Sequence, residues 1–231
     1  MERKTYGQFC ALARSLDHVG DRWTLLIVRE LLLGPATFQS LESALVGISP
    51  NLLVDRLRAL VADGLAIRSA APVRSKRVVY QLTEPGAHLE PAIFELIRWG
   101  ARYMASGVGD DRADPRWATL ALRALLNGPA ARPNPGTIHL DVDGLPITIT
   151  SDGHTRHVLP GHHGTPNATV AATMPDLLAV ASNLRPITEL NDWTKRQATL
   201  VRSLLAASSR TAPTDPPPCR PPSADRPGRR Q

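Results

Sequence analysis

The amino-acid sequence predicts an α+β protein with two domains. Residues 1–106 carry helical apolar spacing that gives way, near their end, to two alternating strands joined by a basic turn. Residues 116–207 carry a helix, a strand–turn–strand pattern, further strands and two more helices. The segment 107–115 between them is rich in glycine and aspartate and is predicted to be a linker. Residues 208–231 hold 7 prolines and almost no aliphatic side chains, which predicts a disordered tail.

Four helices are expected before the first strand, over residues 10–20, 21–34, 35–47 and 50–63. The first repeats Leu12, Leu16 and Val19 at helical spacing. The second is apolar around most of its circumference, so it is expected to be central. The candidate N-caps of the last three are Asp21, Thr37 and Ser49.

The fourth helix has the clearest boundaries and two different sides. Pro50 suits its first position, and Gly64 suits the left-handed residue after its end. Its apolar side is Leu53, Leu57, Leu60 and Val61, and its polar side is Asn51, Asp55, Arg58 and Ala62. The polar side is flanked by small residues and is therefore able to approach a DNA groove closely.

The strands that follow predict a β-wing. Residues 65–71 and 78–83 alternate, and the turn between them carries Arg74, Lys76 and Arg77. A long helix over 84–104 completes the order of a winged helix-turn-helix domain. In such a domain the second short helix enters the major groove of DNA, while the cations of the wing meet phosphate or the minor groove.

The first domain resembles the HxlR-type winged-helix transcription regulators of bacteria over residues 8–104. The matching pieces are Gly20–Asp21–Arg22–Trp23, Leu31–Gly34, Phe38, Leu41, Gly47–Ile48–Ser49, Leu57–Arg58, Leu60, Gly64–Leu65, "VVYQLTEPGAHLEP" and "WG" at 99–100. The resemblance implies a homodimer, formed through the N-terminal segment and the long helix after the wing. It also implies binding to palindromic promoter DNA.

Two groups of residues are the predicted DNA contacts. Asn51, Val54, Asp55 and Arg58 are expected to face the groove, and Thr37, Ser49, Arg74, Lys76 and Arg77 to bind backbone phosphates. The family often has a basic residue where this chain has Asn51, and a small hydroxyl residue where it has Val54. Asn51 can pair with adenine and Val54 can contact a thymine methyl, so a different operator preference is expected. Asp55 can accept from cytosine or orient Arg58.

Cys10 is a candidate redox-sensing residue. It lies where many of these regulators carry a cysteine, which in some relatives senses oxidants or electrophiles. Arg14, one turn away, would favour the reactive thiolate. The alternative is a small apolar residue buried at the dimer contact.

The second domain resembles the sterol-carrier-like fold, a small α+β domain that holds an apolar ligand between its sheet and its helices. The resemblance rests on residues 167–181 and the preceding hairpins. The later "G-x-L-x-V-x-G-D" stretch of that family is absent, and "RPITELNDWTKRQ" stands in its place. The domain is therefore expected to serve either as a pocket for an apolar small-molecule effector or as a module that stabilises the dimer.

Composition and charge limit the kinds of partner and the cellular compartment that the sequence predicts. The net charge of +6 divides into +3 for residues 1–106, zero for 107–207 and +3 for 208–231, which favours an anionic partner for the two ends. Two distant cysteines and no long apolar run predict a cytoplasmic protein without disulfides or membrane spans.

No motif supports an enzyme, a metal site or a cofactor. The sequence has no phosphate-binding glycine loop. His154, His157, His162 and His163 lie in a Gly- and Pro-rich stretch and are expected to be solvated. The rival hypothesis to a DNA-binding regulator is a small-molecule carrier or sensor whose winged helix mediates protein contacts.

Overall fold

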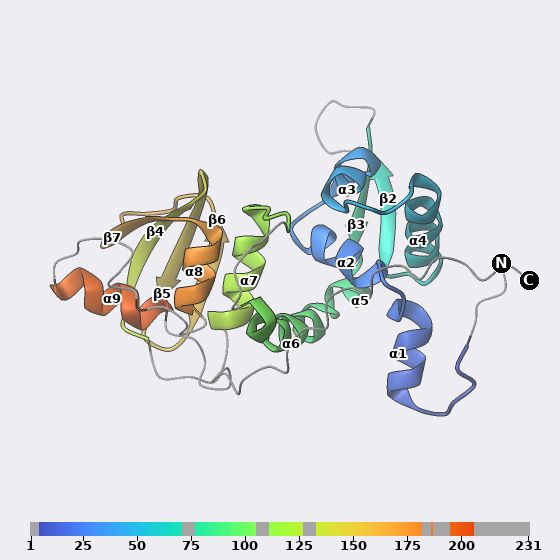
Figure 1. Cartoon of the computed structure of the whole chain (residues 1–231), viewed down its shortest axis with the longest axis horizontal. Helices are drawn as coiled ribbons and strands as arrows, with labels where there is room; N and C mark the ends of the chain where they lie inside the picture. Colours follow the sequence, from blue (N-terminus) through green and yellow to red (C-terminus); the bar gives the residue numbers. More distant parts are fainter. Residues whose placement is uncertain are drawn as a thin grey trace, which may run out of the picture. The chain divides into compact units, whose positions relative to one another are not determined.

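The computed structural model describes residues 5–70, 77–104, 111–126, 133–181, 186 and 195–205. The chain divides into two units, Met1–Glu95 and Leu96–Gln231 (Figure 1). Arg74, Lys76, the predicted tail and residues 107–110 of the predicted linker lie outside the described residues. No helix within the described ranges is long and apolar enough to cross a membrane.

The first unit has the element order of a winged helix. Its elements are α1 (Ala11–Val19), α2 (Thr24–Leu32), β1 (Ala36–Thr37), α3 (Phe38–Ala44), α4 (Pro50–Ala62), β2 (Ala66–Ala70), β3 (Val78–Leu82), α5 (Glu84–Ala87) and the start of α6 (Glu90–Ala101). The three strands form an antiparallel sheet in the order β1-β3-β2. The α+β prediction with an N-terminal winged helix is confirmed.

Local signals explain most of the helix boundaries in this unit. The Thr37 and Ser49 side chains accept hydrogen bonds from Ser40 N and Leu52 N, so the predicted caps of α3 and α4 are confirmed. Gly64 has φ +70 just beyond α4. Its N–H donates to Val61 O and the next N–H donates to Leu60 O, which is the double C-terminal bond of a Schellman motif.

The core of the first unit is aliphatic. Its most buried side chains are Ile27, Val28, Leu41, Leu53, Leu57 and Leu60, contributed by α2, α3 and α4. The helix α2 is therefore central, as its sequence predicts. Leu53, Leu57 and Leu60 of α4 are buried. The helix lies beside β2 (Figure 1).

Three expectations for this unit are wrong in detail. The two-residue strand β1 precedes α3 where only helix was expected. The long helix over 84–104 is broken into α5, α6 and a 3₁₀ turn at Arg102–Met104, because Pro91 has no N–H for a continuous helix. Val61 is exposed, since it lies at the margin of the apolar side of α4. Of the three residues at helical spacing in α1, Val19 is buried, whereas Leu12 and Leu16 are exposed.

The second unit is a mixed sheet with helices. Its elements are α7 (Arg116–Leu126), β4 (Gly136–Val142), β5 (Leu145–Ser151), β6 (Arg156–Pro160), β7 (Ala168–Ala172), α8 (Met174–Ala181) and α9 (Lys195–Leu205). The strand order is β6-β5-β4-β7, and only the β4–β7 pair is parallel. Asp143 and Gly144 both have positive φ at the predicted hairpin turn, which is confirmed.

One face of this sheet packs against helices. Ile138, Leu140, Val142, Ile147 and Ile149 form a continuous apolar core with leucine and valine side chains of α7, α8 and α9. Arg156 of β6 is buried at the margin of the core side, and its Nη1 donates to Leu204 O at 3.3 Å. Burial lowers the pKa of Arg156.

The other face of the sheet carries His139, which sequence reasoning did not single out, beside two of the predicted loop histidines. His162 and His163 are exposed, as expected. His139 of β4 is buried, however, and its ring stacks on His162 with 4.3 Å between ring centroids. Within the described residues, no group of three His, Cys, Asp or Glu side chains is placed to hold a metal ion.

Candidate nucleic-acid interface

The helix-turn-helix consists of α3, the turn at residues 45–49, and α4. Leu45 and Ile48 are buried under the turn, and Gly47 takes φ +93 between them. Val46 and Ser49 stay exposed. The turn therefore directs the N-terminus of α4 toward solvent, while its leucines anchor the helix in the core.

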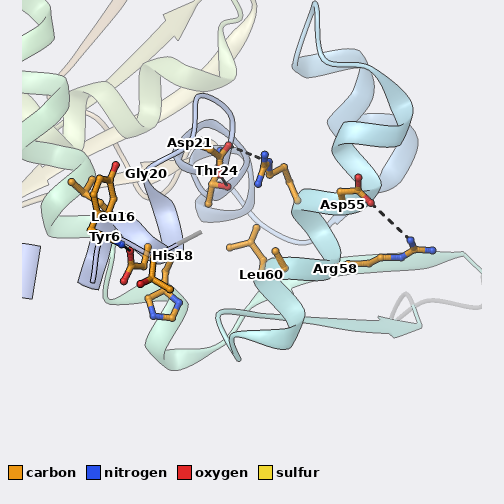
Figure 2. Close-up of a pocket in the computed structure, with 13 residues that line it drawn as sticks. Tyr6, Leu16, His18, Gly20, Asp21, Thr24, Asp55, Arg58 and Leu60 are labelled. Atoms are coloured by element: carbon orange, nitrogen blue, oxygen red, sulfur yellow. Dashed lines mark hydrogen bonds and ion pairs between the residues drawn. The ribbon is translucent and has the colours of Figure 1, made fainter. Parts of the chain in front are cut away.

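The exposed side of α4 brings together the predicted base-reading residues. Asn51, Asp55 and Arg58 are exposed and lie one turn apart, opposite the buried leucines. Val54 is half-buried beside them. Arg58 Nη1 lies 4.0 Å from Asp55 Oδ1, with the two side chains 79% and 58% exposed (Figure 2). This weak pair supports the predicted role of Asp55 in orienting Arg58.

The side chains of Thr37 and Ser49 cap the N-termini of α3 and α4. Thr37 Oγ1 accepts from Ser40 N at 3.1 Å, and Ser49 Oγ accepts from Leu52 N at 3.3 Å. Each hydroxyl still carries a proton to donate. Thr37 donates its own to Ser40 Oγ at 3.2 Å in the free protein.

Two cations on the wing fall within the described residues. Arg77 precedes β3 and is exposed, as predicted. Arg68 of β2 is also exposed and pairs across the ladder with Tyr80. Sequence reasoning missed Arg68, although the alternation of residues 65–70 places it in the strand that leads to the basic turn.

Contacts with the preceding helices fix the position of α4. Asp21 Oδ1 accepts from Trp23 N at 2.8 Å and Thr24 N at 3.1 Å, and Arg56 Nε of α4 lies 3.4 Å from the same oxygen (Figure 2). At the other end of α4, His18 Nδ1 lies 2.9 Å from Asp63 Oδ2. The sequence predicts Asp21 as a cap but gives no sign of its contact with Arg56.

Comparison with known proteins identifies the family. A family model described as HxlR-like helix-turn-helix matches residues 18–107. The uncharacterized HTH-type transcriptional regulator Rv3095 of Mycobacterium tuberculosis is 35% identical in an alignment of 136 residues that covers 54% of this chain and 85% of that protein. The chain belongs to the HxlR-like helix-turn-helix family.

Another relative is the HTH-type transcriptional regulator YodB of Bacillus subtilis, which is 30% identical over 89 residues, 38% of this chain and 80% of YodB. The solved structure of its reduced form is 29% identical, with 43% of this chain and 99% of that chain covered and a TM-score of 0.37. The quinone-bound YodB structure is 27% identical, with 38% and 93% covered and a TM-score of 0.34. The sequence matches and the observed domain make this HxlR-like chain a DNA-binding transcription regulator.

Cys10 of this HxlR-like chain is exposed and stands at the N-cap position of α1. Its carbonyl oxygen accepts from Arg14 N at 2.9 Å. The Arg14 guanidinium instead lies 3.6 Å from Asp17. The described structure therefore leaves the thiol accessible but directs the predicted cationic neighbour to a carboxylate.

Proposed function

We propose that the chain acts as a homodimer that binds a palindromic promoter site, with α4 of each copy in the major groove. The observation that carries this proposal is the polar side of α4. Asn51, Asp55 and Arg58 are exposed although the same helix is anchored by three buried leucines. A helix fixed on one side and polar on the other suits groove recognition.

The side chains on this surface suit base edges. Asn51 pairs with the N6 and N7 atoms of adenine, and Arg58 with the O6 and N7 atoms of guanine. Val54 contacts a thymine methyl group at the margin. Asp55 orients Arg58, in keeping with their 4.0 Å separation.

Backbone phosphates are bound on either side of this surface. The N-terminus of α4 lies beside Ser49, and such helix ends attract anions. Thr37 and Arg77 contribute from α3 and the wing, together with Arg74 and Lys76. Arg68 extends this cationic set along β2.

Exposed apolar side chains support the homodimer. Phe9, Leu12 and Leu16 are exposed at the N-terminal segment and α1, with Leu12 68% exposed. Leu96 and Trp99 of α6 are exposed as well. Burying a large apolar side chain contributes about 1.5–3 kcal/mol. Burial of several of these side chains against a second copy would therefore stabilise the dimer. These are the two segments through which the family resemblance implies dimerisation.

Two modes of modulation accompany this activity. Cys10 is exposed beside the apolar dimer segment, so its oxidation or alkylation would alter that contact. YodB, whose structures include reduced and quinone-bound forms, supports a thiol-based response. The second unit, whose resemblance to the sterol-carrier-like fold stays a prediction, is the proposed site for an apolar effector; its α+β architecture is compatible with that role.

The test is fluorescence anisotropy of the full chain with a duplex from its own upstream region and with a random duplex of equal length. Specific binding should be tighter by about 10³-fold or more, and both affinities should fall steeply with salt. Light scattering of the free protein should give twice the chain mass. Equal affinity for the two duplexes would contradict sequence-specific regulation and favour the alternative, a sensor whose winged helix contacts protein.

A further inference from the structure

Arg22 differs from the other arginines in the stretch from α1 to α4. Residues 11–62 are all described, and their only basic side chains other than histidine are arginines. The others pair with carboxylates: Arg14 with Asp17, Arg29 with Glu30, Arg56 with Asp21 and Arg58 with Asp55. Arg22 is exposed and has no carboxylate partner among the described residues. Its positive charge is therefore available to an anion from outside the chain.

The indole ring of Trp23 supports the Arg22 guanidinium. Cζ of Arg22 lies 5.5 Å from the centroid of the Trp23 ring, within the distance of about 6 Å for a cation–π contact. An aromatic ring limits the rotamers of an arginine, so less side-chain entropy is lost when the arginine binds a ligand. A carboxylate partner would neutralise the charge and occupy the N–H donors. The ring holds the charge in place and leaves it unneutralised.

Two contacts place this pair beside the helix-turn-helix. A Cβ atom at Gly47 would lie 3.8 Å from Cη2 of Trp23, so the indole is within van der Waals distance of the turn that leads into α4. On the other side of Arg22, Asp21 Oδ1 lies 3.4 Å from Nε of Arg56 in the second turn of α4 (Figure 2). Arg22 thus follows one residue that contacts α4 and precedes one that contacts its turn.

A duplex that holds α4 in its major groove brings phosphates close to both flanks of this helix. The groove is about 12 Å wide, and a helix with its side chains is about 10–12 Å across. The residues beside α4 therefore meet the walls of the groove, which carry the phosphates. The wing supplies Arg68 and Arg77 to such phosphates. Arg22 approaches from the start of α2, which is a separate element.

We propose that Arg22 binds a backbone phosphate beside the N-terminal half of α4, and that Trp23 is a positioning residue that holds the guanidinium for this contact. The inference rests on the proposed function and adds a residue that the predicted DNA contacts do not include. The planar fork of arginine matches two phosphate oxygens. Because every sequence carries the phosphate, the contact increases affinity for operator and random DNA alike.

Fluorescence anisotropy of the full chain with operator and random duplexes, over a series of salt concentrations, tests the phosphate contact. Each such contact contributes about 0.9 to the slope of log affinity against log salt. Arg22→Gln should reduce that slope by about 1 for each copy of the chain on the duplex, and weaken both duplexes by about 5- to 10-fold per copy near about 0.1 M salt. Arg22→Lys should retain most of the slope, because the charge remains.

Variants of Trp23 test the positioning role. Trp23→Leu keeps an apolar side chain at the turn but removes the aromatic face, so it should reduce the salt slope as Arg22→Gln does. The double variant should have the slope of Arg22→Gln alone. Trp23→Phe should retain most of the wild-type slope, because a ring remains. Circular dichroism establishes that each variant is folded. Arg22 is exposed, so its variants test the phosphate contact even where Trp23→Leu does not fold.

Arg202→Gln is the matched control, since it removes the same charge from an exposed position on α9 of the second unit. It should leave the slope unchanged; an equal reduction there would mean that Arg22 acts only through net charge. An unchanged slope in folded Arg22→Gln, or a loss confined to the operator, would overturn the phosphate contact. Additive reductions from Arg22→Gln and Trp23→Leu would overturn the positioning role.

Failure of this inference is distinguishable from failure of the proposed function. Wild-type protein that prefers the operator and depends on salt, while Arg22→Gln keeps the same slope, would contradict only the assignment of Arg22. Wild-type protein that binds neither duplex would contradict DNA binding itself, and the assignment of Arg22 with it.

Discussion

Arg58→Ala should weaken operator binding while leaving the fold almost unchanged. In the free protein the Arg58 side chain is 79% exposed and its ion pair with Asp55 is long, at 4.0 Å. An exposed i,i+3 pair contributes about 0.2–0.5 kcal/mol, so loss of the pair should change the unfolding free energy by no more than this. A guanidinium paired with a guanine edge contributes about 1–3 kcal/mol of discrimination. The expected loss of specific affinity is therefore about 5- to 150-fold.

Fluorescence anisotropy on operator and random duplexes, at several salt concentrations, distinguishes contacts with base edges from contacts with backbone phosphates. Arg58→Ala should reduce affinity for the operator much more than for the random duplex. Lys76→Ala provides the contrast, since loss of a phosphate contact should weaken both duplexes alike and reduce the salt slope by about 1. An equal loss on both duplexes with Arg58→Ala would refute the placement of this residue at a base edge.

Three further changes test separate features. Ser49→Ala removes the cap of α4 and should lower the free energy of unfolding by about 1 kcal/mol in urea titrations; an unchanged midpoint would contradict the capping role. Leu12→Glu should yield a folded monomer in light scattering, and a persistent dimer would place the contact elsewhere. Hydrogen bonds from Arg116 hold the pKa of Asp114 below its ordinary value of 3.8, so the carboxylate stabilises the fold above that pH. Asp114→Asn should therefore be less stable than wild type near about pH 7, and the difference should shrink as the pH falls below 3.8 and Asp114 becomes protonated; a constant difference would exclude this linkage.

Sequence reasoning succeeded where a short stretch of chain carries the whole signal. The helix α4 is the clearest case. Ser49, Pro50 and Gly64 mark its ends, and the leucine spacing between them marks its buried side. The Asp143–Gly144 hairpin is equally local, because both residues must take positive φ. Such features depend on a few adjacent residues and do not require contacts with distant parts of the chain.

Features that depend on distant residues were not predictable in this way. The strand β1 has only two residues and exists because β3 supplies its hydrogen bonds. The pairing of Arg56 with Asp21 joins residues 35 positions apart, and no local sequence pattern predicts it. The stacking of His139 on His162 likewise follows from the return of the chain over the sheet. Pro91 is different, since the break before α6 was readable from the sequence and was overlooked.

The parallel pairing of β4 with β7 has a consequence for how the polypeptide acquires its structure during synthesis. In the first unit, the helix-turn-helix and the wing strands are near neighbours along the chain. In the second, Ile138 pairs with Ala168 and Val142 with Ala172, so closure of that sheet waits until residue 172 has left the ribosome. The sheet of the first unit, which pairs β1 and β2 with β3, needs only the chain up to Leu82. We expect the DNA-reading half to be folded on the ribosome while the strands of the other half are still exposed, and pulse proteolysis of stalled nascent chains would reveal that order.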